Sequence, residues 1–235
     1  MKHAKRHPLI FGTIILTATG LITRVIGFFY RIYLSRLFGE EGMGIYQLLS
    51  PALSLSFSLT AAGYQTAISK YVAADSAKRP SGNLKPLLAG ISITLPLSLV
   101  TNAILFFSAD PIGIFLLKDH RTVPMLRILS FSVPFAALHA CINGYFYGKK
   151  KASVPALTQL LEQLARVSCV FLVTGADLAE GRTPSINAAV LGLTVGEIFS
   201  MLIALVCLYI HLYPDNRILS LPNICPSVPV YRDLL

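Results

Sequence analysis

The chain has 235 residues, of which 54% are hydrophobic and 13% are charged, and its formal net charge is +9. Soluble domains carry about 25% charged residues, so this composition excludes an ordinary soluble domain. The positive charge does not indicate nucleic-acid binding, because the basic residues lie mainly in short loops without interleaved aromatic residues. We therefore expect an all-α integral membrane protein whose surroundings are the lipid bilayer.

Six long apolar runs predict six transmembrane helices, each close to the roughly 20 residues that cross a bilayer. In chain order they cover residues 9–34, 45–68, 87–107, 124–147, 154–174 and 186–211. The first run follows Lys2, Lys5 and Arg6, as the apolar region of a signal peptide would. Because it is longer than such a region and lacks a small-residue cleavage site, we predict an uncleaved first span.

The charges between the runs predict the orientation of the helices. Basic residues concentrate in the two tails and in the loops after the second and fourth runs: Lys2, Lys5, Arg6, Lys70, Lys78, Arg79, Lys85, Lys149, Lys150, Lys151, Arg217 and Arg232. The opposite loops hold fewer cations and six acids: Glu40, Glu41, Asp110, Asp119, Asp177 and Glu180. Cytoplasmic loops are enriched in Lys and Arg. We therefore predict a multi-pass protein of the cytoplasmic membrane with both termini on the cytoplasmic side.

Two arginines lie in the first predicted helix, although a charged side chain at the bilayer centre costs about 2.5–3.5 kcal/mol. Arg24 lies roughly 22 Å into a hydrocarbon core of about 30 Å, and Arg31 lies near its outer boundary. Both share one helix face with small residues, namely Thr13, Thr17, Gly20 and Gly27. We predict that this face lines a cavity. Alternatively, Arg24 is the structural partner of a buried carboxylate, and Arg31 extends to the membrane interface.

Polar side chains also share one side of the fifth predicted helix. Glu162 and Arg166 are four residues apart with the acid first, which is the favourable order for an ion pair within a helix. They either neutralise each other or form a hydrophilic cavity wall together with Thr158, Gln159 and Gln163. Glu197 lies near the middle of the sixth helix. Three roles stay open for it: a pair with Arg24, a pair with Arg166, or the uptake of a coupling proton.

Other residues of the spans predict packing. Gly192 and Gly196 form a small-xxx-small pattern suited to close helix contact. His139 is expected to be a packed, hydrogen-bonded residue. The four cysteines, none in a CxxC pair, are expected to be free thiols. The sequence contains no P-loop, HExxH motif or nucleophile elbow. We therefore expect no catalytic residue, metal site or cofactor, and a protein that is not an enzyme.

Five segments resemble one family of membrane proteins. They are TRVIGFFYR at 23–31, FGEEGMGIY at 38–46, AISKYVA at 67–73, NGYFYGK at 143–149 and QLLEQLAR at 159–166. Together they resemble the stage V sporulation protein B family. This family belongs to the polysaccharide-transporter branch of the MOP superfamily, alongside MurJ-type lipid II flippases and the more distant MATE exporters. The resemblance extends over nearly the whole chain.

The resemblance implies a fold and a function. Family members fold as two six-helix lobes around a central cavity with alternating access, and the cavity takes a lipid-linked saccharide pyrophosphate such as a peptidoglycan or spore-cortex precursor. A cationic cavity suits a pyrophosphate, which is bound through charge-assisted hydrogen bonds. Arg24 matches an arginine in the first helix of the MurJ type. The predicted substrate-binding residues are Arg24, Arg31, Glu162, Arg166 and Glu197.

The chain is much shorter than members of that family. Residues 1–213 are expected to form a six-helix N-terminal lobe, and 214–235 a cytoplasmic connector toward a missing second lobe. The chain is then a truncated product, the partner of a separately encoded second lobe, or one half of a dimer. Two other functions stay open: a MATE-like cation-coupled exporter of organic cations, and an inactive fragment or membrane scaffold for a cell-wall complex.

Overall fold

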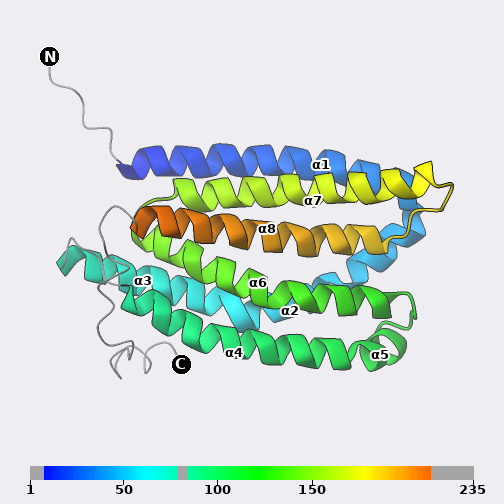
Figure 1. The fold of residues 1–235 in the computed structure, drawn as a ribbon, viewed down its shortest axis with the longest axis horizontal. Helices are drawn as coiled ribbons and strands as arrows, with labels where there is room; N and C mark the ends of the chain where they lie inside the picture. Colours follow the sequence, from blue (N-terminus) through cyan, green and yellow to red (C-terminus); the bar gives the residue numbers. More distant parts are fainter. Residues whose placement is uncertain (1–7, 79–83, 213–235) are drawn as a thin grey trace, which may run out of the picture.

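A computed structural model describes residues 8–78 and 84–212 as an elongated bundle of helices (Figure 1). No strand occurs within these two ranges. Five helical stretches of the described chain are long and apolar enough to cross a membrane. The prediction of an all-α membrane protein is confirmed, and the chain is a multi-pass membrane protein. The predicted connector at 214–235 lies outside the described residues.

Ten helical elements follow one another along the described chain. They are α1 (Pro8–Leu48), α2 (Ser50–Phe57), the π-helical turn η1 (Ser58–Ala62), α3 (Gly63–Lys78), α4 (Lys85–Phe107), α5 (Ala109–Pro111), the π-helical turn η2 (Ile112–Leu116), α6 (Thr122–Gly148), α7 (Ser153–Ala179) and α8 (Asn187–Leu212). The last four predicted spans correspond to α4, α6, α7 and α8, and α7 continues beyond its predicted end at residue 174.

The first two predicted spans share one helical stretch, Gly12–Ser76. The loop expected at 35–44 is instead helical, and the chain turns at Gly39, whose φ of 69° interrupts α1. Glycine adopts this left-handed conformation without a Cβ clash, so the turn needs no separate loop. Figure 1 shows α1 running along one edge of the bundle and α2 and α3 running back in the opposite direction. The stretch therefore crosses the bundle in both directions.

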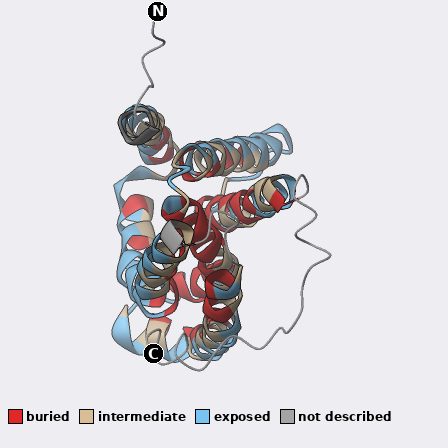
Figure 2. Cartoon of the chain, turned by 90° about the vertical axis from the view of Figure 1, so that its left-hand side faces the viewer, coloured by how far each residue is buried: buried red, intermediate tan, exposed pale blue. Residues whose placement is uncertain are grey.

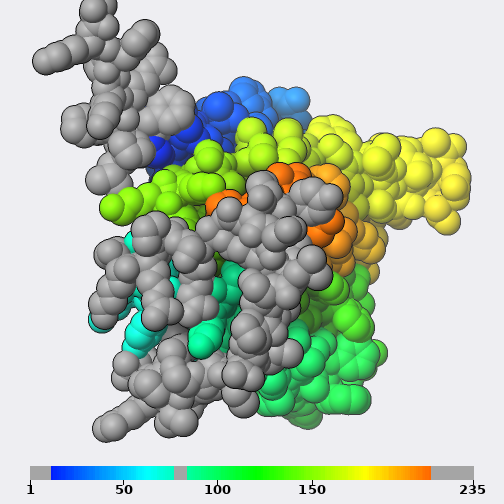
Figure 3. Space-filling model, turned by 60° about the vertical axis from the view of Figure 1, so that its left-hand side comes forward, coloured from blue at the N-terminus to red at the C-terminus, as the bar shows by residue number. Residues whose placement is uncertain are grey.

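Helix α6 lies at the centre of the packing. It contacts α3, α4 and α8, whereas α1 packs mainly against α7. Tyr145 and Phe146 of α6 are fully buried, as are Met125 and Leu126 nearer its start. Figure 2 shows buried residues concentrated on the inward faces of the helices, and Figure 3 shows α1 lying along α7, away from α3 and α4. Because α1 has one main neighbour, the face that carries its arginines is not covered by the central helices.

Glycines allow the closest helix contacts. A Cβ built on Gly144 of α6 would lie 2.6 Å from the carbonyl oxygen of Gln65 in α3, and one on Gly148 would lie 2.7 Å from that of Ser69. On α8, a Cβ on Gly192 would lie 2.4 Å from a methyl group of Val170 in α7. The neighbouring Gly196 faces the α7 backbone, with 3.1 Å to the Glu162 carbonyl oxygen. The predicted close helix contact at Gly192 and Gly196 is confirmed. The equivalent pair on α6, Gly144 and Gly148, was not predicted from the sequence.

Ion pairs join the loops at one end of the bundle. Arg121, just before α6, contacts Glu41 of α1 at 2.6 Å and Asp119 at 3.0 Å. Arg127 contacts Asp110 at 2.6 Å, and Arg182 contacts Glu180 at 2.7 Å. The acids of the predicted non-cytoplasmic loops are thus largely neutralised by arginines of the same end. The grouping of these loops agrees with the predicted topology, while the side of the membrane they face stays a prediction.

Substituting Gly144 by alanine should destabilise the bundle. The new methyl group would meet backbone atoms of Gln65, which cannot move aside without shifting α3, and overpacking of this kind costs about 1–3 kcal/mol. The free energy of unfolding, measured by SDS titration in mixed micelles, should fall by that amount. The matched control is Gly175→Ala on α7, where nothing lies within 4 Å of the new atom. Equal stability of the two variants would contradict the packing described here.

Acidification should open the loop that precedes α6. Hydrogen bonds donated by the Arg121 guanidinium and backbone amide hold the pKa of Asp119 below its usual value. Because the pKa is lowered, these hydrogen bonds contribute their full stability at pH values above the usual aspartate pKa of about 3.9. This stability is lost as the pH falls through the folded-state pKa of Asp119. The amide chemical shift of Arg121 should therefore titrate with a midpoint below that of a free aspartate. Arg121→Ala should raise the midpoint, and an unchanged midpoint in this variant would disprove the cause.

Candidate functional site

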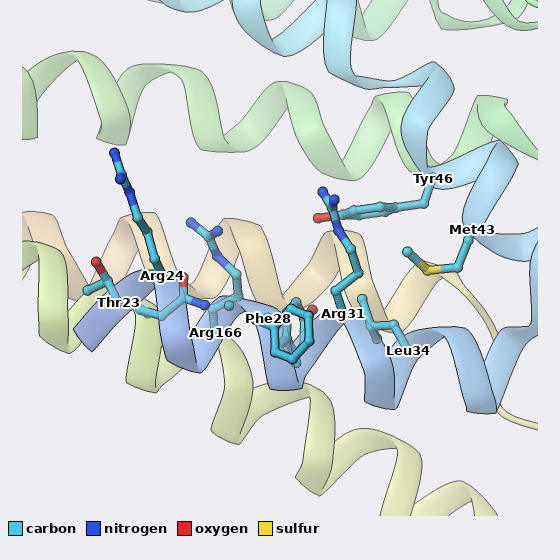
Figure 4. A pocket seen from close by; sticks show the side chains of 11 residues that line it. Thr23, Arg24, Phe28, Arg31, Leu34, Met43, Tyr46 and Arg166 are labelled. Carbon is cyan, nitrogen blue, oxygen red and sulfur yellow. The ribbon is translucent and has the colours of Figure 1, made fainter. Parts of the chain in front are cut away.

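A cavity of ≈ 420 Å³ lies between α1 and α7. Its lining includes three arginines, two from α1 and one from α7, and Figure 4 shows them with the neighbouring side chains. The lining residues are Thr23, Arg24, Gly27, Phe28, Tyr30, Arg31, Leu34, Met43, Tyr46, Gln163 and Arg166. None of these is acidic. The face of α1 predicted to line a cavity does so through Arg24, Gly27 and Arg31.

The two arginines of α1 are exposed within the isolated chain. Arg24 extends away from α1, and Arg31 points toward the ring of Tyr46 (Figure 4). Arg31 and Tyr46 also line a neighbouring hollow of ≈ 240 Å³, so Arg31 stands where the two spaces meet. Within residues 8–78 and 84–212, no carboxylate pairs with Arg24 or Arg31. The alternative that Arg24 serves a buried carboxylate therefore has no support in this part of the chain.

Arg166 joins the cavity to the interior of the bundle. Its guanidinium forms an ion pair with Glu162 one turn earlier on α7, as the order of the two residues predicted. Its side chain is 22% exposed and that of Glu162 is 16% exposed. The Nε–H of Arg166 is buried without a hydrogen-bond partner, and so is the hydroxyl group of Tyr30 across the cavity. Both groups are buried donors on residues that line the cavity.

Glu197 lies on the other side of the pair, next to α6. Its carboxylate is 3.6 Å from Nδ1 of His139, and no ion pair with Arg24 or Arg166 forms in the described chain. The ligand-type atoms of His139, Glu162 and Glu197 all lie within 4.8 Å of one another. His139 is buried, and its Nε2 is 2.7 Å from the amide nitrogen of Asn143 and 2.9 Å from the hydroxyl of Ser200. The prediction that His139 is packed and hydrogen-bonded is confirmed.

The five predicted site residues thus fall into two connected places. Arg24, Arg31 and Arg166 line the cavity. Glu162 and Glu197 lie in the polar cluster of α6, α7 and α8, and Glu162 is connected to the cavity through its ion pair with Arg166. Sequence reasoning missed that His139 joins the two glutamates, because the three residues come from three helices. It also missed Tyr30 and Tyr46, since tyrosines in an apolar run give no sign of facing a cavity.

The cavity is suited to a multiply charged anion. Guanidinium groups are planar, always charged and able to form paired hydrogen bonds with phosphate oxygens. Three of them, with two tyrosines and a glutamine, line a half-open hollow between α1 and α7. A cation would find no acidic residue in this lining. The arrangement therefore suits the binding of an anionic group between α1 and α7.

Comparisons with known proteins identify relatives. The sequence matches the family described as polysaccharide biosynthesis protein over residues 9–229. In Bacillus subtilis (strain 168), it is 36% identical to stage V sporulation protein B over 197 residues, which is 83% of this chain and 38% of that protein. It is 26% identical to the uncharacterized membrane protein YabM over 213 residues (91% and 39%) and 27% identical to the lipid II flippase MurJ over 179 residues (72% and 32%). The chain spans less than two fifths of the length of these relatives.

The stability lost when the Glu162–Arg166 pair is broken should depend on which of the two partners is replaced. Arg166→Met leaves the Glu162 carboxylate without its guanidinium partner and beside Glu197, and we expect a loss of about 3 kcal/mol. Glu162→Gln should cost less, because the freed guanidinium can reach water in the cavity. The double variant should regain part of the stability lost in Arg166→Met.

SDS titrations of the four proteins form a double-mutant cycle that measures this coupling. The control is Arg182→Met, which breaks an exposed pair and should change stability little. Additive effects of the two substitutions on the free energy of unfolding would show that the two side chains are not energetically coupled.

Proposed function

Because the chain belongs to the polysaccharide biosynthesis protein family, we propose that it is the N-terminal lobe of a flippase-type transporter for a lipid-linked saccharide. The cargo is an isoprenoid pyrophosphate that carries a sugar unit of peptidoglycan, of the spore cortex or of a related polysaccharide. The names of two relatives support this cargo, since one is a sporulation protein and another a lipid II flippase.

One observation carries the proposal. Arg24, Arg31 and Arg166 line the same cavity, and Arg24 has no acidic partner among the described residues. Unpaired cations on membrane-spanning helices are expensive, so a protein retains them where a ligand supplies the missing negative charge. A pyrophosphate supplies that charge, and its lipid tail can remain in the surrounding bilayer while the charged group enters between α1 and α7.

A MATE-like exporter of organic cations is the rival function. Such a cargo needs negative charge or uncompensated aromatic faces at the binding site. The described lining has three aromatic residues but no acid, and its three arginines would repel a cation. The acids inside the bundle, Glu162 and Glu197, lie toward α6 and α8 and are engaged with Arg166 and His139. The cavity therefore favours an anionic cargo.

The rest of the assignment follows from the sequence. We propose that residues 1–213 form the lobe, that 214–235 lead toward a second lobe, and that both termini face the cytoplasm, as the basic loops predict. A second lobe would cover the exposed face of α1 that carries Arg24 and Arg31. The protein acts by binding and reorientation, without a catalytic residue or a cofactor.

Substituting Arg24 by alanine should weaken cargo binding while leaving insertion and folding intact. A charge-assisted hydrogen bond contributes about 1.5–3 kcal/mol, so the affinity for fluorescent undecaprenyl pyrophosphate in nanodiscs should fall roughly tenfold to a hundredfold. Arg24→Lys should retain part of the affinity, because it keeps the charge but loses the planar donor pair.

The matched control is Arg182→Ala, which removes an exposed arginine of the α7–α8 loop and should not affect binding. Normal cargo binding by the Arg24→Ala variant, with wild-type helix content by circular dichroism, would refute the cavity assignment and with it the proposed function.

A further inference from the structure

The polar cluster behind the cavity has a charge imbalance. It contains the carboxylates of Glu162 and Glu197, the guanidinium of Arg166 and the imidazole of His139. With both carboxylates ionised and the imidazole neutral, two negative charges face one positive charge. The cluster lies among α6, α7 and α8, where an uncompensated charge is strongly disfavoured. One further positive charge would neutralise it.

The hydrogen bonds around His139 show how a proton can supply that charge. Nδ1 faces the Glu197 carboxylate at 3.6 Å, and Nε2 lies 2.7 Å from the side-chain amide of Asn143. With both ring nitrogens protonated, Nδ1–H points to Glu197, and Nε2–H can donate to the Asn143 oxygen once the amide has turned. The hydroxyl of Ser200 is 2.9 Å from Nε2 and can accept a hydrogen bond once this nitrogen is protonated. A divalent metal fits less well, because it would turn one missing positive charge into one excess charge beside Arg166.

Other charged groups lie too far away to balance the cluster. Helix α4 packs against α6 where Thr94 contacts Cys141. The charged residue of α4 is Lys85 at its start, nine residues before Thr94. That is about 14 Å along the helix axis. On α3, the first charged residue is Lys70, next to Ser69, which faces Gly148. His139 lies nine residues before Gly148, so Lys70 is displaced by a similar distance. Arg24 and Arg31 of α1 are on the cavity side.

Arg166 connects this cluster to the cavity. Glu162 holds its guanidinium on one side, while the side chain also lines the cavity and keeps an unpartnered Nε–H. Once His139 is positively charged, it competes with Arg166 for the nearby carboxylates. The guanidinium is then free to turn toward an anion in the cavity. Proton binding on the side of α7 that faces α6 and α8 thereby strengthens anion binding on the side that faces α1.

We propose that His139, Glu162 and Glu197 form a proton-binding site, and that proton uptake there strengthens anion binding in the cavity through Arg166. This inference rests on the proposed function and deepens it, because it makes the proton and the anionic cargo bind together. Linkage requires the effect to be mutual: the anion must also favour uptake of the proton. Coupling of this kind between two sites typically changes affinity about 5–150-fold.

The test uses a probe whose own charge does not depend on pH. Methanedisulfonate carries two fixed negative charges, and none of the lining residues Arg24, Arg31, Arg166, Tyr30 and Tyr46 ordinarily titrates between about pH 5 and 8. Its affinity for the chain in nanodiscs should be about tenfold higher at pH 5 than at pH 8. In histidine-labelled protein at a fixed pH, addition of the probe should move the ¹⁵N signals of the His139 ring toward those of a charged imidazole.

Two variants separate the steps of the coupling. His139→Gln keeps hydrogen-bonding groups but cannot become charged, so its affinity should stay at the wild-type value for pH 8 at every pH. Glu162→Gln releases Arg166 permanently, so its affinity should stay at the higher value. His211→Gln, at the far end of α8, is the matched control and should keep the wild-type pH dependence. Circular dichroism confirms that each variant is folded, with His139→Asn as a second neutral replacement.

The outcomes distinguish this inference from the proposed function. Retained pH dependence in His139→Gln, or weaker binding in Glu162→Gln, overturns the proton site while the cavity assignment stands. A pH effect that disappears after EDTA treatment and returns with Zn²⁺ also overturns it, in favour of a metal site. Failure of the probe to bind at any pH, together with unchanged cargo binding in Arg24→Ala, removes the proposed function itself.

Discussion

The ion pair between Glu162 and Arg166 is the contact on which the polar interior depends. A guanidinium within an apolar bundle needs a carboxylate or a ligand, and this arginine lies where it can have either. The pair gives α7 two polar faces, one toward α1 and the cavity, the other toward α6 and α8. Without it, the cavity would hold only the cations of α1, and the two glutamates would repel each other beside a neutral histidine.

Close helix contacts hold this pair in place. Gly192 and Gly196 of α8 pack against the backbone of α7 at the level of Arg166 and Glu162, so a larger residue there would push α8, and Glu197 with it, away from the pair. Gly144 and Gly148 do the same between α6 and α3. Small residues thus set the distances between polar groups in the bundle, because they let the helix backbones approach each other closely.

Much of the fold could be predicted from the sequence, because runs of apolar residues report directly on membrane spans. The Gly192–Gly196 contact and the Glu162–Arg166 pair were also predictable, since each depends on spacing within one helix. The partner of Glu197 was not, because His139 reaches it through the packing of α6 on α8. The turn at Gly39 was missed as well, since the positive φ of a single glycine replaced the expected loop.

The π-helical turn η1 has a consequence for how the chain tolerates change. A π turn holds more residues than an α turn, so Ser58–Ala62 rotates everything that follows relative to α2. Straightening the same residues into a regular α-helix would turn α3 by about 100° about its axis, and Gln65 and Ser69 would leave the glycine faces of α6. Deleting one residue together with the π turn would instead leave α3 in nearly its present orientation. The segment should therefore tolerate the loss of one residue, because the π turn holds one residue more than a regular helix needs.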